Sequence, residues 1–355
     1  MARILNKNKQ FNGLLKKKVL VGLSGGVDSS VAALLLKRKG FDVVGGYMNL
    51  EAEDNRCCSL ESRNRAKAVA DVLGIPFYSF DMRKEFRKKI VSKFVDQYKR
   101  NITPNPCVDC NKEIKFGLFL EKALALEFDY VATGHYIRKD KKDQTNRILK
   151  GKDPKKDQSY FLWRLNQTQL DRILFPLGEY TKEKTRELAK KYNLPTFDAK
   201  ESQEVCFVKS TVAEFLKERL GERKGKIINL DGNELGNHQG IYFYTIGQRK
   251  GLGLSGGPYF VVGKDIKKNY LIVSKNESDF LSREVFLDQV NWVSGKEPDF
   301  PIRARVKIRY GHKPALAEIR KNSIIFDVPQ KAITAGQSAV FYKGIELIGG
   351  GVICE

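Results

Sequence analysis

Short apolar runs alternate with amphipathic stretches through the first half of the chain. The apolar runs predict buried strands at 19–22, 42–48, 77–80 and 129–133. Helical periodicity between them predicts helices at 31–38, 61–73, 83–100 and 112–126. Strands that alternate with helices predict an α/β domain built on a doubly wound parallel sheet. Ligands bind such sheets at the carboxyl ends of the strands.

The pattern changes in the second half of the chain. A polar, lysine-rich turn is expected at 138–146, and helices are expected at 156–163, 181–192 and 212–220. A Gly-rich stretch follows, and after Pro258 short strands dominate, at 259–262, 270–273, 302–310, 315–320, 323–328 and 338–342. Short strands at even spacing predict a small β-barrel. We therefore expect three domains, at 1–208, 209–280 and 281–355, of which the small central one links the other two.

The stretch from Val19 to Ser30 has the form of a strand, a glycine-rich turn and a helix. Gly25 and Gly26 have no Cβ, so their backbone can adopt positive φ and approach a ligand closely. Successive N–H groups and the helix dipole then favour an anion. Asp28 is expected to cap the helix or to hold a metal ion bound to phosphates. An ordinary turn is the alternative, but nucleotide-binding α/β folds place their phosphate loop at this position.

The glycine turn matches neither of the two best-known nucleotide motifs. No Gly-Lys-Ser/Thr follows it, so it is not a Walker loop, and it is not the Gly-x-Gly-x-x-Gly of dinucleotide folds. Ser-Gly-Gly-Val-Asp-Ser at 24–29 instead resembles the pyrophosphate loop of ATP pyrophosphatases, which adenylate a carbonyl oxygen and release pyrophosphate. This loop alone leaves the acceptor open between a carboxylate, a xanthine and a tRNA base.

Composition adds a strong positive charge. The 355 residues include 64 basic and 42 acidic ones, which gives a net charge of +22. This charge indicates either nucleic-acid binding through phosphate contacts or solvated lysine faces. Arg303, Arg305, Lys307 and Arg309 alternate with apolar residues, so they share one predicted strand face, with the same two interpretations. No run of about 18 apolar residues occurs, and 1–18 lacks the apolar segment of a signal peptide, so we expect a cytoplasmic protein.

Cysteines supply the candidate chemistry. Cys107 and Cys110 lie at the predicted start of a helix, where the dipole favours a thiolate, and Cys206 lies in a remote polar loop. Such a pair fits sulfur transfer, in which one cysteine carries a persulfide and the other resolves it through a disulfide. Two metal sites are the alternatives: zinc on Cys57, Cys58, Cys107 and Cys110, or an iron–sulfur cluster on Cys107, Cys110 and Cys206.

The remaining cysteine and the histidines are expected to have different roles. Cys354 is expected to be a buried residue without a role in the chemistry. His135 ends a predicted strand inside the predicted cleft, which makes it the functional candidate. His238 and His312 have no companions of the kind that bind metals, so both are expected to be structural.

Several motifs together resemble one family, the bacterial tRNA-specific 2-thiouridylases, over nearly the whole chain. In chain order they lie at 22–30, 103–116, 132–136, 156–162, 201–207, 245–253 and 349–351. Each is moderately specific, and their order makes the match strong. The resemblance implies an adenine nucleotide α-hydrolase-like domain that binds ATP and carries catalysis, a small central domain, and a C-terminal β-barrel that contacts tRNA.

The resemblance also implies a reaction. ATP adenylates the 2-carbonyl oxygen of the wobble uridine of tRNA, and a persulfide sulfur then displaces AMP, which gives 2-thiouridine. A urea-like carbonyl is a poor electrophile, so its oxygen must first become a leaving group, and a base in a loop can be splayed into a pocket. The implied cofactors are ATP and Mg²⁺, with no metal site made by the protein. The implied partners are tRNA and a persulfide-donating sulfur-relay protein, and we expect a monomer.

The same resemblance implies roles for single residues. Cys110 is the implied nucleophile and Cys206 the implied persulfide carrier. The nucleotide is implied to contact Gly22, Leu23, Ser24, Gly25, Gly26, Val27, Asp28, Ser29, Met48 and Gly134. The tRNA is implied to contact Asn105, Pro106, Cys107, His135, Lys156, Asp157, Gln158, Arg309, Tyr310 and Gln337. Cys107 departs from the family pattern, because many relatives carry an Asp there, and so does the segment 49–51, where a run with Lys and Trp is expected.

Three other functions compete with this interpretation. An amide-forming or guanidino-forming ATP pyrophosphatase would share the loop at 24–29 without needing Cys110 and Cys206. A nucleic-acid-binding protein with a regulatory nucleotide site would bind tRNA and release no pyrophosphate. An iron–sulfur tRNA thiolase would act on a different base.

Overall fold

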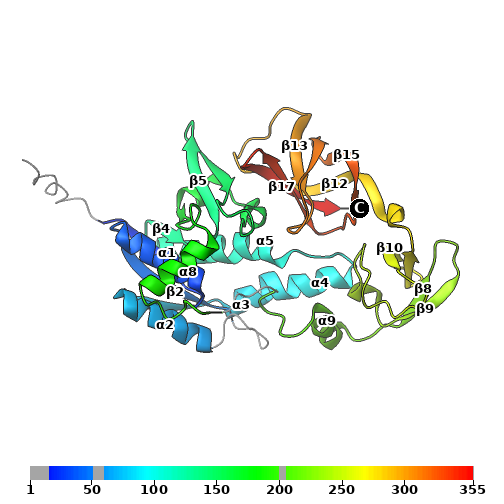
Figure 1. The fold of residues 1–355 in the computed structure, drawn as a ribbon, viewed down its shortest axis with the longest axis horizontal. Helices are drawn as coiled ribbons and strands as arrows, with labels where there is room; N and C mark the ends of the chain where they lie inside the picture. Colours follow the sequence, from blue (N-terminus) through cyan, green and yellow to red (C-terminus); the bar gives the residue numbers. More distant parts are fainter. Residues whose placement is uncertain (1–15, 51–59, 200–204, 355) are drawn as a thin grey trace, which may run out of the picture.

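The computed structural model describes residues 16–50, 60–199 and 205–354, and it arranges them in three parts (Figure 1). A parallel sheet flanked by helices lies at one end of the molecule, and a small central domain lies at the other (Figure 1). Long helices run between these two parts, and a β-barrel lies over them. The predicted α/β class with a C-terminal barrel is confirmed.

The first sheet is wholly parallel, with the strand order β3-β2-β1-β4-β7. Its central strand is buried on both faces, as expected for a parallel sheet covered by helices on each side. Val19 and Val21 pack into one hydrophobic cluster with helices α1, α2 and α8, and Leu20 packs into a second cluster on the opposite face. The elements are β1 (Lys18–Gly22), α1 (Val27–Arg38), β2 (Asp42–Asn49), α2 (Leu60–Leu73), β3 (Phe77–Asp81), β4 (Tyr130–Ala132), β7 (Ile173–Leu174) and α8 (Lys182–Lys191).

Two long helical stretches cover the second face of the sheet and continue beneath the barrel (Figure 1). Each contains a π-helical stretch in its middle. The first comprises α3 (Arg83–Phe86), η1 (Arg87–Ser92) and α4 (Lys93–Lys99). The second comprises α5 (Pro106–Cys110), η2 (Asn111–Leu118) and α6 (Phe119–Ala125). The second stretch starts six residues before the predicted 112, because Asn105 caps it and Pro106 occupies the first helical turn, where its missing N–H is not needed.

The segment 138–146 is a β-hairpin and not the predicted turn. Strands β5 (Ile137–Lys142) and β6 (Thr145–Lys150) are joined through Asp143 and Gln144, both with positive φ, as in the tight turns that suit hairpins. The sequence concealed these strands because β5 is an outer strand of the sheet with several exposed polar residues. Strand β6 pairs with the last strand of the barrel, so this hairpin ties the first half of the chain to the second.

The C-terminal part is a closed antiparallel barrel of six strands. They pair in the order β12-β15-β14-β13-β16-β17 and back to β12. The last strand contains the glycine run, and a Cβ at Gly350 would lie 2.8 Å from the Trp163 ring, so the glycine lets the strand pack directly on this indole. The strands are β12 (Leu281–Trp292), β13 (Ile302–Lys307), β14 (Ala315–Ile319), β15 (Ser323–Lys331), β16 (Ser338–Lys343) and β17 (Glu346–Cys354).

The small central domain has its own hydrophobic cluster around a four-stranded sheet, ordered β10-β11-β8-β9. Thr211 and Glu214 form a capping box at the start of α9, which begins and ends where the sequence predicts. The elements of this domain are α9 (Val212–Leu220), β8 (Gly225–Ile228), β9 (Glu234–His238), η4 (Ile241–Phe243), β10 (Phe260–Asp265), β11 (Tyr270–Ser274) and η5 (Glu277–Phe280). Two short helices outside it, η3 (Ser159–Leu162) and α7 (Gln167–Asp171), connect β6 to β7. Within the described ranges, no helix has the length and apolarity needed to cross a membrane.

The packing of the β5–β6 hairpin against the barrel can be tested at Ile148. This side chain is fully buried in a cluster with Trp163 and Leu347. We expect Ile148→Ala to lower the free energy of unfolding by about 2–5 kcal/mol, because it leaves a cavity. Urea unfolding followed by tryptophan fluorescence measures this change. Ile266→Ala, at a half-exposed position, is the control and is expected to change stability by about 0.5 kcal/mol or less. Equal effects of the two substitutions would contradict this packing.

Candidate functional site

The predicted phosphate loop has the geometry of an anion site. Gly26 is the N-cap of α1 and makes no side-chain cap, so the first N–H groups of this helix have neither an intrahelical nor a side-chain partner. Gly25 has a φ of 74°, and a Cβ there would lie 2.3 Å from the Ser62 carbonyl oxygen at the start of α2. Both observations explain why glycine is required at this turn.

Serine hydroxyls hold the loop in shape. Ser29 Oγ donates to the Gly26 carbonyl at 3.0 Å and accepts from Ser24 N at 3.1 Å. Ser30 Oγ donates to the same carbonyl at 2.9 Å. Ser29 and Ser30 are buried, so their hydroxyls brace the loop, and Ser24 presents the exposed hydroxyl of the three.

The loop lies where the order of the sheet reverses. Strands β1 and β4 are neighbours, and their following connections diverge to opposite sides, which is the place where such sheets bind ligands. After β4, the chain passes so close to the loop that a Cβ on Gly134 would lie 2.7 Å from Ser29 N. Met48, at the end of β2, borders the same region, because a Cβ on Gly22 would lie 3.1 Å from Met48 Cε. The structure thus brings together the residues that the sequence assigned to the nucleotide.

Asp28 is not the helix cap, since Gly26 holds that position, and its carboxylate is bound by two side chains, so a metal ion at Asp28 stays a prediction. Lys182 Nζ lies 2.7 Å from each of its carboxylate oxygens, and the Tyr136 hydroxyl donates to Oδ1 at 2.7 Å. Lys182 is the first residue of α8, and only 12% of its side chain is exposed. Sequence reasoning missed this lysine, because nothing in the pattern of α8 distinguishes it from the other lysines there.

The nucleophile candidate lies on the helix that begins beside the barrel. Asn105 Oδ1 accepts from Val108 N at 3.4 Å and caps this helix, so Cys107 falls in its first turn, as predicted. Cys107 is exposed, whereas Cys110 is buried. Asp109, between them, forms ion pairs with Lys93 at 2.9 Å and Arg164 at 2.5 Å.

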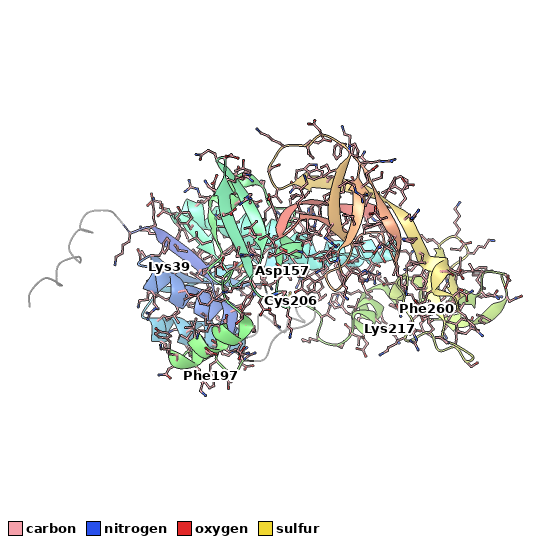
Figure 2. All side chains as sticks on the ribbon, turned by 45° about the horizontal axis from the view of Figure 1, so that its top comes forward. Lys39, Asp157, Phe197, Cys206, Lys217 and Phe260 are labelled. Atoms are coloured by element: carbon pink, nitrogen blue, oxygen red, sulfur yellow. The ribbon has the colours of Figure 1, made fainter. Side chains whose placement is uncertain are left out.

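Cys206 approaches the same region from a remote part of the chain. Phe207, beside it, is buried among Phe86, Phe94 and Phe215. Cys206 and Met48 are partly buried, and both pack against the hydrophobic cluster that contains Cys110. Figure 2 shows Cys206 near the middle of the molecule, between the parallel sheet and the central domain. Cys57, Cys58 and 200–204 lie outside the described residues, and among the described residues no three His, Cys, Asp or Glu side chains gather as a metal site.

Most residues expected to contact tRNA make contacts within the protein. Asp157 accepts from the N–H groups of Gly151 and Ser159, both at 3.1 Å, and Gln158 Oε1 accepts from Tyr136 N at 3.0 Å. His135 is 7% exposed and hydrogen-bonds Thr133 Oγ1 at 2.7 Å. Burial lowers its pKa well below the usual value, so the ring is neutral at pH 7. A contact of these side chains with tRNA stays a prediction.

Three of the four cations share the outer side of β13, and Arg309 lies beyond the end of this strand. Strand β13 ends at Lys307, before the predicted 310. Arg303 is exposed and pairs with Asp327 at 2.6 Å, whereas Arg309 is partly buried and donates to the Ile246 carbonyl at 3.3 Å and to Thr334 Oγ1. Desolvation lowers the pKa of Arg309. The alternation therefore predicted the two sides of β13 correctly as far as Lys307. A contact of this outer side with nucleic acid stays a prediction.

An aromatic surface remains open beside these residues. Tyr310 is 40% exposed, and its ring lies 4.6 Å from that of Phe161. Lys307 Nζ lies 5.0 Å from the centroid of the Tyr310 ring. An exposed aromatic ring with a cation beside it suits the stacking of a base and the binding of its phosphate.

Comparison with known proteins defines the class. Three family models match in order: "tRNA methyl transferase HUP domain" at 17–210, "tRNA methyl transferase PRC-barrel domain" at 213–275 and "Aminomethyltransferase beta-barrel domain" at 282–353. The chain is thus a three-domain protein built on a HUP-type nucleotide-binding fold. The structure of NMN synthetase from Francisella tularensis is similar over 53% of this chain and 66% of that chain at 19% identity, with a TM-score of 0.35, too low to support an inference.

Curated relatives narrow this class. The chain is 46% identical to the tRNA-specific 2-thiouridylase MnmA of Carboxydothermus hydrogenoformans, over 95% of this chain and 98% of the relative. It is 44% identical to the protein of the same name from Clostridioides difficile, over 96% and 98%. The chain therefore belongs to the tRNA-specific 2-thiouridylase family, and the predicted resemblance is confirmed.

The phosphate loop can be tested at Gly25. Gly25→Ala forces a side chain into positive φ and against the Ser62 carbonyl, so we expect the affinity for MgATP to fall about 10- to 100-fold, from roughly 1–3 kcal/mol of strain. Isothermal titration calorimetry measures the affinity. Gly232→Ala is the matched control, since Gly232 has a φ of 87° but open space around it and lies in the central domain. An unchanged affinity in Gly25→Ala would contradict the assignment.

Lys182 can be tested together with Asp28. We expect Lys182→Met to lower the rate of ATP consumption about 100-fold, because it removes a cation from the loop and leaves the Asp28 carboxylate facing the phosphates. Adding Asp28→Asn should restore part of the loss, since it removes that repulsion. Lys184→Met, at an exposed position of the same helix, is the control. A Lys182→Met protein as active as the control would exclude this role.

Proposed function

We propose that this protein converts the wobble uridine of tRNA to 2-thiouridine with ATP and a persulfide sulfur. The observation that carries the proposal is the convergence of Cys110, Cys206 and Met48 on one hydrophobic cluster below the nucleotide-binding sheet. A synthetase that forms an amide or a guanidino group would need no such pair of thiols. The family relationship and the net charge of +22 support tRNA as the substrate.

The first step uses the phosphate loop. The 2-carbonyl oxygen of the base attacks the α-phosphorus of ATP, pyrophosphate leaves, and the base carries AMP on that oxygen. The N–H groups at the start of α1 and the Lys182 ammonium would stabilise the negative charge of the phosphates. Because Lys182 contacts both oxygens of Asp28, Mg²⁺ would enter with the phosphates of ATP, whose charge it neutralises, and would not need Asp28 as a ligand.

The second step uses the two thiols. The terminal sulfur of a Cys206 persulfide attacks C2 of the base, and AMP leaves with its oxygen. The Cys110 thiolate then attacks the inner sulfur of Cys206, the sulfur–sulfur bond breaks, and the outer sulfur stays on the base. A Cys110–Cys206 disulfide forms, and a thiol reductant returns both cysteines to thiols. A persulfide-donating sulfur-relay protein would reload Cys206.

The surface around Tyr310 suits the tRNA. Tyr310 and Lys307 offer a stacking ring and a cation, and Lys156 is partly exposed. Burial lowers the pKa of Lys307 and raises that of Tyr310, so the phenol stays neutral at physiological pH. We propose that tRNA lies over the barrel and the long helices, and that Asp157, Gln158 and His135 support this surface from within. We also propose that the protein acts in the cytoplasm as a monomer.

The two-thiol mechanism predicts the behaviour of cysteine variants. Wild type, given unmodified tRNA, MgATP, a persulfide donor and a thiol reductant, should form 2-thiouridine, as measured by mass spectrometry of tRNA nucleosides. Cys110→Ser and Cys206→Ser should each lower its yield at least about 1000-fold, because the step loses its nucleophile or its sulfur carrier. Cys354→Ser, in the last barrel strand, is the matched control and should retain activity. Full activity in Cys110→Ser would instead favour a synthetase.

A further inference from the structure

The loop that leads to Cys110 is held by the barrel. Gln337 Nε2 donates to the carbonyl oxygens of Thr103 and Pro104, both at 3.1 Å. Thr103 N donates to the Ala335 carbonyl at 3.0 Å. These bonds join residues more than 230 positions apart in the chain. They fix the two residues that directly precede Asn105, the cap of the helix that carries Cys110.

Shape supports the same contact. Gly336 is buried and has a φ of 89°. A Cβ there would lie 2.3 Å from Ile102 Cγ2 and 2.7 Å from the Thr103 carbonyl oxygen. The barrel loop at 332–337 can therefore approach the loop at 102–105, which we call the catalytic loop because it leads to Cys110, only because Gly336 has no side chain.

The barrel loop is itself fixed. Gly336 N donates to the Ile353 carbonyl and Ile353 N donates to the Gln337 carbonyl, both at 2.8 Å, so the loop is bound to the last strand. The partly buried Arg309 guanidinium donates to Thr334 Oγ1 and to the Ile246 carbonyl in the central domain. A rigid barrel thus presents Gln337 in one position, and the contact transmits that position to 103–105.

The other side of the helix is also tied to the barrel. Asp109, next to Cys110, binds Arg164, and Arg164 Nη2 donates to Gln289 Oε1 of β12 at 2.9 Å. Cys110 therefore lies between two attachments to the barrel, one through Gln337 and one through Arg164. Without the attachment at its start, the helix that carries the thiol would keep the lateral hydrogen bonds and the packing of Val108 in one hydrophobic cluster with Val340 and Tyr342 of the barrel.

We propose that Gln337 is a positioning residue for the chemistry of Cys110, through which the barrel sets the path of the catalytic loop. The proposal rests on the function proposed above. It differs from the role in tRNA contact that the family resemblance implies, because the Gln337 amide donates its hydrogen bonds to the protein's own loop at 103–104. A contact with tRNA alone would affect binding, whereas a positioning role affects the rate of the bound complex.

The test is Gln337→Glu, which keeps the shape of the side chain and replaces a donor with an oxygen facing two carbonyl oxygens. We expect the single-turnover rate of thiolation at saturating tRNA to fall about 10- to 100-fold, with the dissociation constant for tRNA within about twofold of wild type. Hydrogen exchange of the amides at 102–110 should accelerate, and exchange at 19–30 should not. Gln330→Glu is the matched control, because its amide contacts only its own neighbourhood on the barrel.

A second pair of variants keeps the test valid if Gln337→Glu fails to fold, which thermal unfolding would reveal. Gly336→Ala should reproduce the slow rate and the faster exchange at 102–110. Gly344→Ala, at a φ of 58° with open space around it on the same barrel, should reproduce neither. An unchanged single-turnover rate in Gln337→Glu, whatever its affinity for tRNA, overturns the proposal, and so does a slow rate with unchanged exchange at 102–110. Failure of wild type to form 2-thiouridine would instead reject the proposed function, and the exchange experiment would still test the contact.

Discussion

The close approach of Gly134 to the phosphate loop is the constraint on which the nucleotide site depends. Two parallel strands end side by side, and their following segments touch backbone to backbone at Asp28 and Ser29. Tyr136 follows Gly134 by two residues, so its hydroxyl reaches Asp28, and Lys182 completes the set from α8. The contact of Gly134 with the loop thereby places Asp28 next to Tyr136 and Lys182. It is possible because Gly134 has no side chain.

The rest of the molecule brings sulfur chemistry to this nucleotide site. The long helix of Cys110 starts under the barrel, where Gln337 and the Arg164 guanidinium hold its first turns, and runs from there to the parallel sheet (Figure 1). Cys206 joins the same hydrophobic cluster through Phe207, which is buried among other aromatic rings. The barrel is thus part of the architecture around Cys110, the proposed nucleophile, as well as the proposed surface for tRNA.

Local sequence patterns predicted the features that depend on neighbouring residues alone. Apolar runs predicted the parallel strands, helical periodicity predicted the helices at 181–192 and 212–220, and Gly25 predicted a turn with positive φ. Contacts between remote segments were beyond reach. The hairpin at β5 and β6 reads as a polar turn because its partner, β17, lies almost 200 residues away, and Lys182 looks like any surface lysine until Asp28 is placed beside it. Arg309 reads as a surface cation because alternation cannot show that β13 ends at Lys307.

The central claim is that Cys110 and Cys206 act on one sulfur atom. The most direct measurement is peptide mapping by mass spectrometry after one turnover of Cys206-persulfidated protein with tRNA and MgATP, without reductant. The account predicts a Cys110–Cys206 disulfide in an amount equal to the 2-thiouridine formed. Thiouridine without that disulfide, or with a disulfide between Cys107 and Cys110 in its place, would contradict it.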